Sequence, residues 1–179
     1  LTRLINQVLD LARLESQRMD WEEESFSVRE VIGSALDSTA QLFRESGVTV
    51  VRELDEASLF VRADRDRLTQ VMLNLLSNAL KFAPARNGRV EVRCRREGET
   101  VHVEVSDNGP GIPTEEQEIV FEKFRQSGDA LTGKPRGTGL GLPISRQIIE
   151  HFGGTLTVRS RPGEGATFIF TLPLEAPHG

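Results

Sequence analysis

The sequence contains very little of the chemistry that disulfides and zinc sites require. Among its 179 residues there is one cysteine, Cys94, and there are three histidines, His102, His151 and His178. A single cysteine excludes an internal disulfide and every zinc site built from several cysteines. No apolar run approaches the roughly 20 residues that a membrane-spanning helix needs. We therefore expect a soluble domain from a reducing compartment.

The sequence also lacks an excess of positive charge. Lys and Arg number 22 against 27 Asp and Glu, which gives a net charge of −5. This balance predicts no broad attraction to nucleic acid or to an anionic membrane. Hydrophobic residues make up 37% and charged residues 27%, as in an ordinary folded protein. The length fits one domain with an appendage, and the start at Leu1 without a signal-peptide pattern predicts a piece of a longer protein.

Residues 1–18 carry apolar side chains at spacings of three and four, which predicts an amphipathic helix. Two interpretations stay open. The helix packs on its own domain, or it belongs to a coiled coil or bundle whose partners lie partly upstream. The second is favoured because an acidic segment, residues 21–25, separates the helix from the rest. We expect residues 21–26 to be a linker, residues 27–174 one domain, and residues 175–179 a tail.

Helical and extended patterns alternate after this point, and residues 109–138 are rich in glycine and proline, which predicts a long loop. Asp64 is placed to cap a helix. We expect helices over residues 28–45, 65–82 and 140–152, and strands over residues 48–53, 59–63, 90–95, 101–105, 155–160 and 166–172. This order predicts an α+β fold, a two-layer α/β sandwich of a mostly antiparallel mixed sheet and about three helices, preceded by a bundle-type helix.

Two common nucleotide-binding motifs, the P-loop and the dinucleotide fingerprint, are excluded by the residues that flank their glycines. Residues 128–134 have the spacing of a P-loop, but Pro135 stands where that motif needs a Ser or Thr hydroxyl, and no strand precedes it. The glycines of residues 137–141 do not form a dinucleotide fingerprint, because Leu142 follows them and no strand leads into them.

Four other segments fit a nucleotide site. Asn74 and Asn78 lie on one helical face, with Lys81 close to it. Asp107 ends a predicted strand and is followed by glycines, so its carboxylate can accept from an exocyclic amine. Residues 121–124 place two aromatics in a polar stretch, and residues 137–141 put glycine-rich backbone at a helix N-terminus, which favours phosphate. Taken singly, these segments also fit polar decoration, a turn, a small local core and a flexible loop.

In this order, residues 74–82, 107–111, 121–124 and 137–142 resemble the N, G1, F and G2 boxes of sensor histidine kinases. The resemblance runs from about Phe26 to Leu172, and residues 1–20 look like the last part of a helix in that family's dimerisation domain. It implies the ATP-binding catalytic domain of the family, with the Bergerat-type fold that gyrase, Hsp90 and MutL share.

The resemblance also implies roles for residues. Asn78 would ligate Mg²⁺, Lys81 would meet phosphate oxygens, Asn74 would support this cluster, and Asp107 would accept from the adenine amine. The implied catalytic residues are Asn74, Asn78 and Lys81. The residues implied in ATP binding are Asn78, Lys81, Phe82, Asp107, Gly109, Gly111, Ile112, Phe124, Lys134, Arg136, Gly137, Thr138, Gly139, Leu140, Gly141, Leu142 and Thr167.

Residues 125–136 would form a lid over the nucleotide, with Phe121 and Phe124 anchoring its start. Either Lys134 or Arg136 would reach the γ-phosphate. In relatives that hydrolyse ATP, a glutamate four residues before the Mg²⁺ asparagine activates water. Asn74 stands there, and its amide takes no proton near neutral pH, so transfer to a supplied nucleophile is favoured over hydrolysis. A gyrase-type hydrolase, a non-catalytic ATP-responsive module and an anti-sigma serine kinase are the alternatives.

The acceptor histidine of the family lies in a His-Glu or His-Asp motif that none of the three histidines has. We therefore expect the acceptor upstream of Leu1. The implied partners are a dimerisation domain with that histidine, a response-regulator receiver domain and, in the full-length protein, a second copy in a homodimer. No nucleic-acid partner is implied. The implied location is cytoplasmic, with the parent protein free or membrane-anchored.

Overall fold

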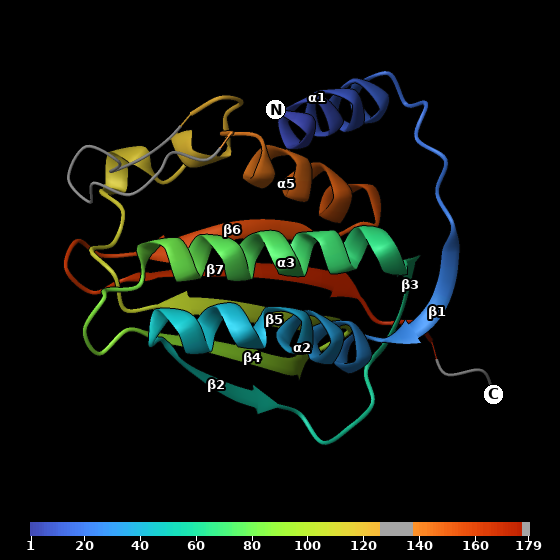
Figure 1. Ribbon diagram of the computed structural model, residues 1–179. Helices are drawn as coiled ribbons and strands as arrows, with labels where there is room; N and C mark the ends of the chain where they lie inside the picture. Colours follow the sequence, from blue (N-terminus) through green and yellow to red (C-terminus); the bar gives the residue numbers. More distant parts are fainter. Residues whose placement is uncertain (126–137, 177–179) are drawn as a thin grey trace.

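The computed structural model describes residues 1–125 and 138–176. They form two layers, a five-stranded sheet and a layer of helices packed on it (Figure 1). The strands follow the order β2 (Thr49–Leu54), β4 (Arg89–Glu97), β5 (Thr100–Asp107), β7 (Ala166–Pro173) and β6 (Thr155–Ser160). β2 and β4 are parallel, and the other neighbours are antiparallel. The predicted mixed, mostly antiparallel sheet is therefore confirmed.

Three helices cover one face of this sheet, namely α2 (Val28–Ser46), α3 (Arg65–Phe82) and α5 (Gly141–His151) (Figure 1). Each buries an apolar stripe. The stripe of α3 consists of Leu68, Val71, Met72, Leu75, Leu76 and Ala79. Two short 3-10 helices, η1 (Thr114–Glu116) and η2 (Ile119–Phe121), lie between β5 and α5 along the chain. All three predicted helices form, with ends within one residue of the prediction.

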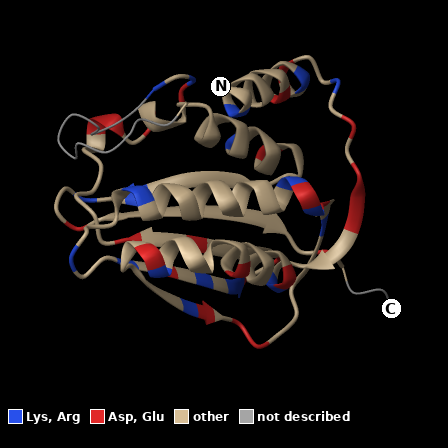
Figure 2. Ribbon diagram, in the orientation of Figure 1, with Lys and Arg blue, Asp and Glu red and all other residues tan. Residues whose placement is uncertain are grey.

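The sequence sets where α3 begins and where it ends. The Asp64 carboxylate accepts from the Arg67 backbone N–H at 3.1 Å, so the predicted cap is present. Pro84 follows Ala83 and excludes a further helical turn. The charged residues of α3 gather at these ends and leave its middle uncharged (Figure 2). The middle of α3 can therefore pack against neighbours on several sides.

The expected linker is partly a strand. β1 (Glu23–Ser27) pairs antiparallel with β3 (Phe60–Asp64), in a sheet of its own. Phe26 is buried there, whereas the acidic residues face solvent, and Glu24 pairs with Arg65 at 2.8 Å. The acidic composition hid this strand from sequence analysis, because cross-strand partners rather than local propensity hold it in place.

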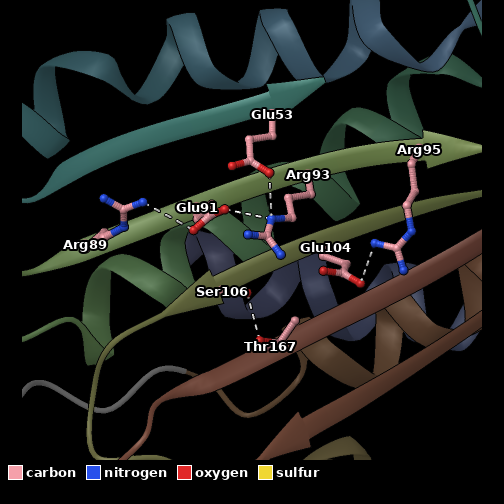
Figure 3. Close-up of polar contacts among 8 residues, drawn as sticks. All are labelled: Glu53, Arg89, Glu91, Arg93, Arg95, Glu104, Ser106 and Thr167. Atoms are coloured by element: carbon pink, nitrogen blue, oxygen red, sulfur yellow. Dashed lines mark hydrogen bonds and ion pairs between the residues drawn. The ribbon is translucent and has the colours of Figure 1, made fainter. Parts of the chain in front are cut away.

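The opposite face of the main sheet carries a polar network (Figure 3). Arg93 bonds to Glu91 at 2.7 Å and to Glu53 at 3.0 Å, and Arg95 bonds to Glu104 at 3.0 Å. No helix of the described ranges packs on this face, and its alternation of apolar-in and polar-out residues is that of a half-exposed antiparallel sheet.

α1 (Thr2–Glu15) packs along α5 (Figure 1). Leu11 is buried against the domain, and Trp21 stacks on His151 with ring centroids 4.0 Å apart. The helix therefore packs on its own domain, and it still exposes apolar residues on another face, among them Leu1, Ile5, Val8 and Leu9. Within the described ranges, no helix has the length and apolarity to span a membrane.

Candidate nucleotide site

A cavity of about 350 Å³ lies where α3, the end of β5 and the start of α5 meet. The predicted site residues that line it are Asn74, Asn78, Lys81, Phe82, Asp107, Gly111, Ile112, Thr138, Gly139, Gly141 and Leu142. Three of the four sequence segments, far apart along the chain, are thus brought to one cavity.

α3 supplies the polar wall of the cavity. Asn74, Asn78 and Lys81 all line it, as their helical spacing predicts, together with Ser77. The Asn74 amide nitrogen donates to the Ser145 hydroxyl of α5 at 3.1 Å, and Ser145 is buried. This bond fixes the orientation of the Asn74 amide, so that its oxygen faces the start of α5.

Asp107 supplies a carboxylate at the end of β5. It is 8% exposed, and its Oδ1 accepts from the Gly109 backbone N–H at 2.9 Å. A side chain at position 109 would collide with the Phe82 carbonyl oxygen at the end of α3. Gly109 itself does not line the cavity, so its place in the site is to let the loop after β5 pack tightly and hold Asp107.

The start of α5 closes the cavity beside Asn74. A Cβ at position 141 would collide with the Asn74 side-chain oxygen, so any larger residue there would force the Asn74 amide to move. Thr138 and Gly139, which precede the helix, line the cavity as well. Leu140 lies between them and Gly141 but is fully buried in the core, and it does not line the cavity.

Besides Gly109 and Leu140, two further predicted residues, Thr167 and Phe124, do not line the cavity. Thr167 is on the outer face of β7, where its hydroxyl is 2.8 Å from that of Ser106, and it does not line the cavity, so its contact with ATP stays a prediction (Figure 3). Its neighbours Ala166 and Phe168 point inward and line the cavity. Phe124 is 62% exposed and does not line the cavity, and its backbone N–H donates to the Gly139 carbonyl at 2.9 Å.

Phe121, by contrast, is buried and packs edge-on against Phe168, so it anchors the segment that leads to residue 125. Lys134, Arg136, Gly137 and the predicted lid from residue 126 onward lie outside the described residues. Arg125, the first residue of that predicted lid, lines the cavity.

Sequence analysis missed several residues of the cavity. Ala166 and Phe168 were recoverable, because strand alternation that starts from the buried Phe170 places both on its face. Arg3 and Gln7 of α1 also line the cavity. Nothing in their local sequence indicates this, since it depends on where α1 docks.

The charges of the cavity suit a nucleotide. Arg3, Lys81 and Arg125 supply positive charge, and Asp107 supplies a buried acceptor. Among the described residues, no cluster of three or more His, Cys, Asp or Glu side chains is available to a metal ion. A hard cation would therefore rely on amide oxygens such as that of Asn78 together with oxygens of a bound ligand.

Residues 63–176 match the protein family described as histidine kinase-, DNA gyrase B- and HSP90-like ATPases. The chain is 35% identical over 173 residues to sensor histidine kinase WalK of Bacillus subtilis, and 37% identical over 174 residues to sensor protein KdpD of Escherichia coli. Each similarity covers 96% of this chain, but the chain spans only 28% of WalK and 19% of KdpD.

The chain is also similar to solved structures of histidine kinases. The nucleotide-free catalytic domain of histidine kinase ThkA superposes with a TM-score of 0.74 at 33% identity, over 85% of this chain and 97% of that one. Full-length ShkA in complex with AMPPNP gives 0.86 at 27% identity, over 99% of this chain and 36% of that one. ThkA in complex with response regulator protein TrrA gives a TM-score of 0.74 at 29% identity, over 97% of this chain and 49% of that one.

Proposed function

The chain belongs to the histidine kinase-, DNA gyrase B- and HSP90-like ATPase family, as a histidine kinase catalytic domain, and we propose that it transfers the γ-phosphate of ATP to a histidine. Membership of this family implies ATP binding. The acceptor would lie on a dimerisation domain, from which the phosphate passes to an aspartate of a response regulator.

One observation carries this proposal. The amides of Asn74 and Asn78 and the ammonium of Lys81 share a cavity with the buried carboxylate of Asp107. A nucleoside triphosphate needs an acceptor for its base and donors or cations for its phosphates, and this cavity offers both. We assign the adenine amine to Asp107 and the phosphates to Lys81 and the backbone at the start of α5.

The donor set also fits Mg²⁺. The Asn78 side-chain oxygen is a hard donor of the kind this ion accepts, and a triphosphate brings the remaining oxygens. When bound, the ion would neutralise charge on the phosphates. The protein's own contribution is to hold the triphosphate against α3, with Lys81 near its charge and Asn74 fixed by Ser145.

Transfer then requires a nucleophile that reaches the γ-phosphorus. The unprotonated nitrogen of the acceptor imidazole forms a bond to phosphorus while the bond from phosphorus to the β–γ bridging oxygen breaks. ADP leaves with that oxygen, and the proton on the other imidazole nitrogen passes to water. Asn74 occupies the position where hydrolysing relatives carry a base, and its amide takes no proton near neutral pH. Within the described ranges no carboxylate except Asp107 lines the cavity, which supports transfer over hydrolysis.

The two histidines of the described residues, His102 and His151, are unsuited to be the acceptor. His102 lies within 3.1 Å of Glu97 on the outer face of the sheet, and His151 stacks on Trp21. Neither lines the cavity. We therefore propose an acceptor on a separate dimerisation segment, a homodimer in the full-length protein, a receiver domain as the next partner and a cytoplasmic location.

The test is incubation of the chain with γ-labelled ATP and Mg²⁺, with and without a fragment that carries the acceptor histidine. We expect acid-labile, base-stable label on the added fragment and none on this chain. Label retained on the isolated chain would overturn our assignment of the histidines. Release of inorganic phosphate without labelling of the fragment would favour a hydrolase.

A further inference from the structure

The nucleotide cavity has a wall that comes from outside the catalytic domain. Arg3 and Gln7 of α1 line it together with Asn74 and Lys81 of α3. Arg3, Gln7 and Asp10 follow one another at helical spacings of four and three residues, so they share one face of α1. The face with Arg3, Gln7 and Asp10, rather than the apolar face of the helix, is directed toward α3 and the cavity.

Polar contacts hold this face in place. The Thr138 hydroxyl, beside the glycines before α5, donates to the Gln7 side-chain oxygen. Asp10 pairs with Arg67 of α3 at 3.3 Å, and both side chains are about four-fifths buried (19% and 23% exposed). Glu15 pairs with Lys123 near the end of η2. α1 is thus tied to three segments that surround the cavity.

Arg3 occupies a defined end of the cavity. Arg3 and Gln7 also line an adjoining groove, with Asn74, Ser77 and Gly141 but without Asp107. Arg3 therefore belongs to the side of the cavity formed by Asn74 and the start of α5, which is the side that we assign to the phosphates. Among the described residues, no carboxylate forms an ion pair with Arg3, in contrast to Asp10 and Glu15 on the same helix.

We propose that Arg3 binds the terminal phosphate of the triphosphate, so that α1 and the γ-phosphate stabilise each other's position. This inference rests on the proposed function, because it takes the bound ligand to be ATP. A guanidinium forms paired hydrogen bonds with phosphate oxygens. Because coupling between two binding events is reciprocal, ATP favours docking of α1 and docked α1 favours ATP, whereas ADP lacks the phosphate concerned.

The test compares nucleotide affinities of the whole chain and two variants by calorimetric titration in Mg²⁺. Arg3→Ala should weaken binding of AMPPNP about tenfold, the loss expected for one charge-assisted phosphate contact, and should change ADP binding little. Arg3→Lys should recover part of the loss. Arg13→Ala removes the same charge from an exposed position of α1 that does not line the cavity, and it should leave both affinities unchanged.

Amide hydrogen exchange over residues 2–15 gives the second readout. AMPPNP should protect α1 more than ADP does, and Arg3→Ala should remove the difference. If the unaltered chain binds AMPPNP but Arg3→Ala behaves like Arg13→Ala, the role of Arg3 is refuted and the proposed function stands. If Arg3→Ala weakens ADP and AMPPNP equally, recognition of the terminal phosphate is refuted. If the unaltered chain binds neither nucleotide, both proposals fall.

Discussion

Asp107 is the single residue that the proposed recognition of adenine requires most. Its Oδ1 already accepts from Gly109, and its burial removes competing water. Asp107→Asn keeps the shape but presents a second donor to the adenine amine. An unmatched buried polar group costs about 1–3 kcal/mol, so ATP binding should weaken by about 5- to 150-fold.

Calorimetric titration of Asp107→Asn with ATP and with inorganic tripolyphosphate checks this prediction, since only ATP binding should suffer strongly. Ser106→Ala is the matched control, because Ser106 is the neighbouring residue on the opposite face of β5, bonded to Thr167. ATP affinity that is equal in Asp107→Asn and Ser106→Ala would remove Asp107 from the site.

Cys94 gives a prediction about stability. Burial raises the pKa of its thiol to about 11, and the nearby Asp55 carboxylate adds to the rise. The unfolded chain loses this proton near pH 9, whereas the folded chain keeps it up to about pH 11. The stability that Cys94 contributes is therefore fully present below about pH 9 and is lost as the pH rises toward 11.

Urea unfolding at pH 8 and pH 10 measures this effect. The free energy of unfolding should fall by about 1 kcal/mol more in the unaltered chain than in Cys94→Ala over this interval. The comparison uses the change with pH, so the cavity that the smaller side chain leaves does not enter. Parallel pH dependences of the two proteins would contradict a raised thiol pKa.

At the scale of single residues, the sequence was informative wherever helical or strand periodicity decides the direction in which a side chain points. Helical spacing was sufficient to predict that Asn74, Asn78 and Lys81 share a face, and they line one cavity. Asp107 was recognisable from its position at a strand end. Thr167, which the resemblance implied, lies outside the cavity lining, because strand alternation turns its side chain outward and turns Ala166 and Phe168 inward.

At the scale of elements, the contact between α3 and α5 shapes the cavity. Gly141→Ala would drive a Cβ into the Asn74 side-chain oxygen. Overpacking of this kind costs about 1–3 kcal/mol, and it would also displace the amide that Ser145 holds. We expect a lower melting temperature. We also expect weaker nucleotide binding, because Asn74 lines the cavity.

Gly33→Ala in α2 is the control for that substitution, because nothing lies within 4 Å of the added Cβ. It should stabilise the protein by about 0.5–1 kcal/mol, through the better helix propensity of alanine, and leave nucleotide affinity unchanged. Thermal unfolding and titration of both variants decide the point. Unchanged stability and affinity in Gly141→Ala would show that the two helices need no close approach.

The helices were predictable because each carries its own boundary signals. Asp64 caps α3, Pro84 lies just beyond its end, and Gly47 ends α2 in a left-handed conformation. β1 was not predictable, since its stability comes from pairing with β3, and its first residues are acidic. Local patterns thus identified the elements that stabilise themselves and missed the one that depends on a distant partner.

For the molecule as a whole, sequence analysis predicted the layers but not the docking of α1. The favoured interpretation was a helix whose partners lie partly upstream. In the structure it packs on α5, buries Leu11 and reaches α3 through Asp10, and it leaves other apolar residues exposed. This docking depends on contacts between residues about 60 to 130 positions apart, such as Asp10 with Arg67 and Gln7 with Thr138. Such contacts leave no local pattern in the sequence.

Calorimetric titration of the whole chain with AMPPNP, with and without Mg²⁺, for the unaltered protein and Asn78→Ala, tests the nucleotide site most directly. We predict one site per chain, with affinity that drops at least about tenfold when Mg²⁺ is omitted. Asn78→Ala should bind with nearly the same weaker affinity whether or not Mg²⁺ is present, because the ion has lost its protein ligand. Full Mg²⁺-dependent affinity in Asn78→Ala, or no binding by the unaltered chain, would contradict a nucleotide site built on this face of α3.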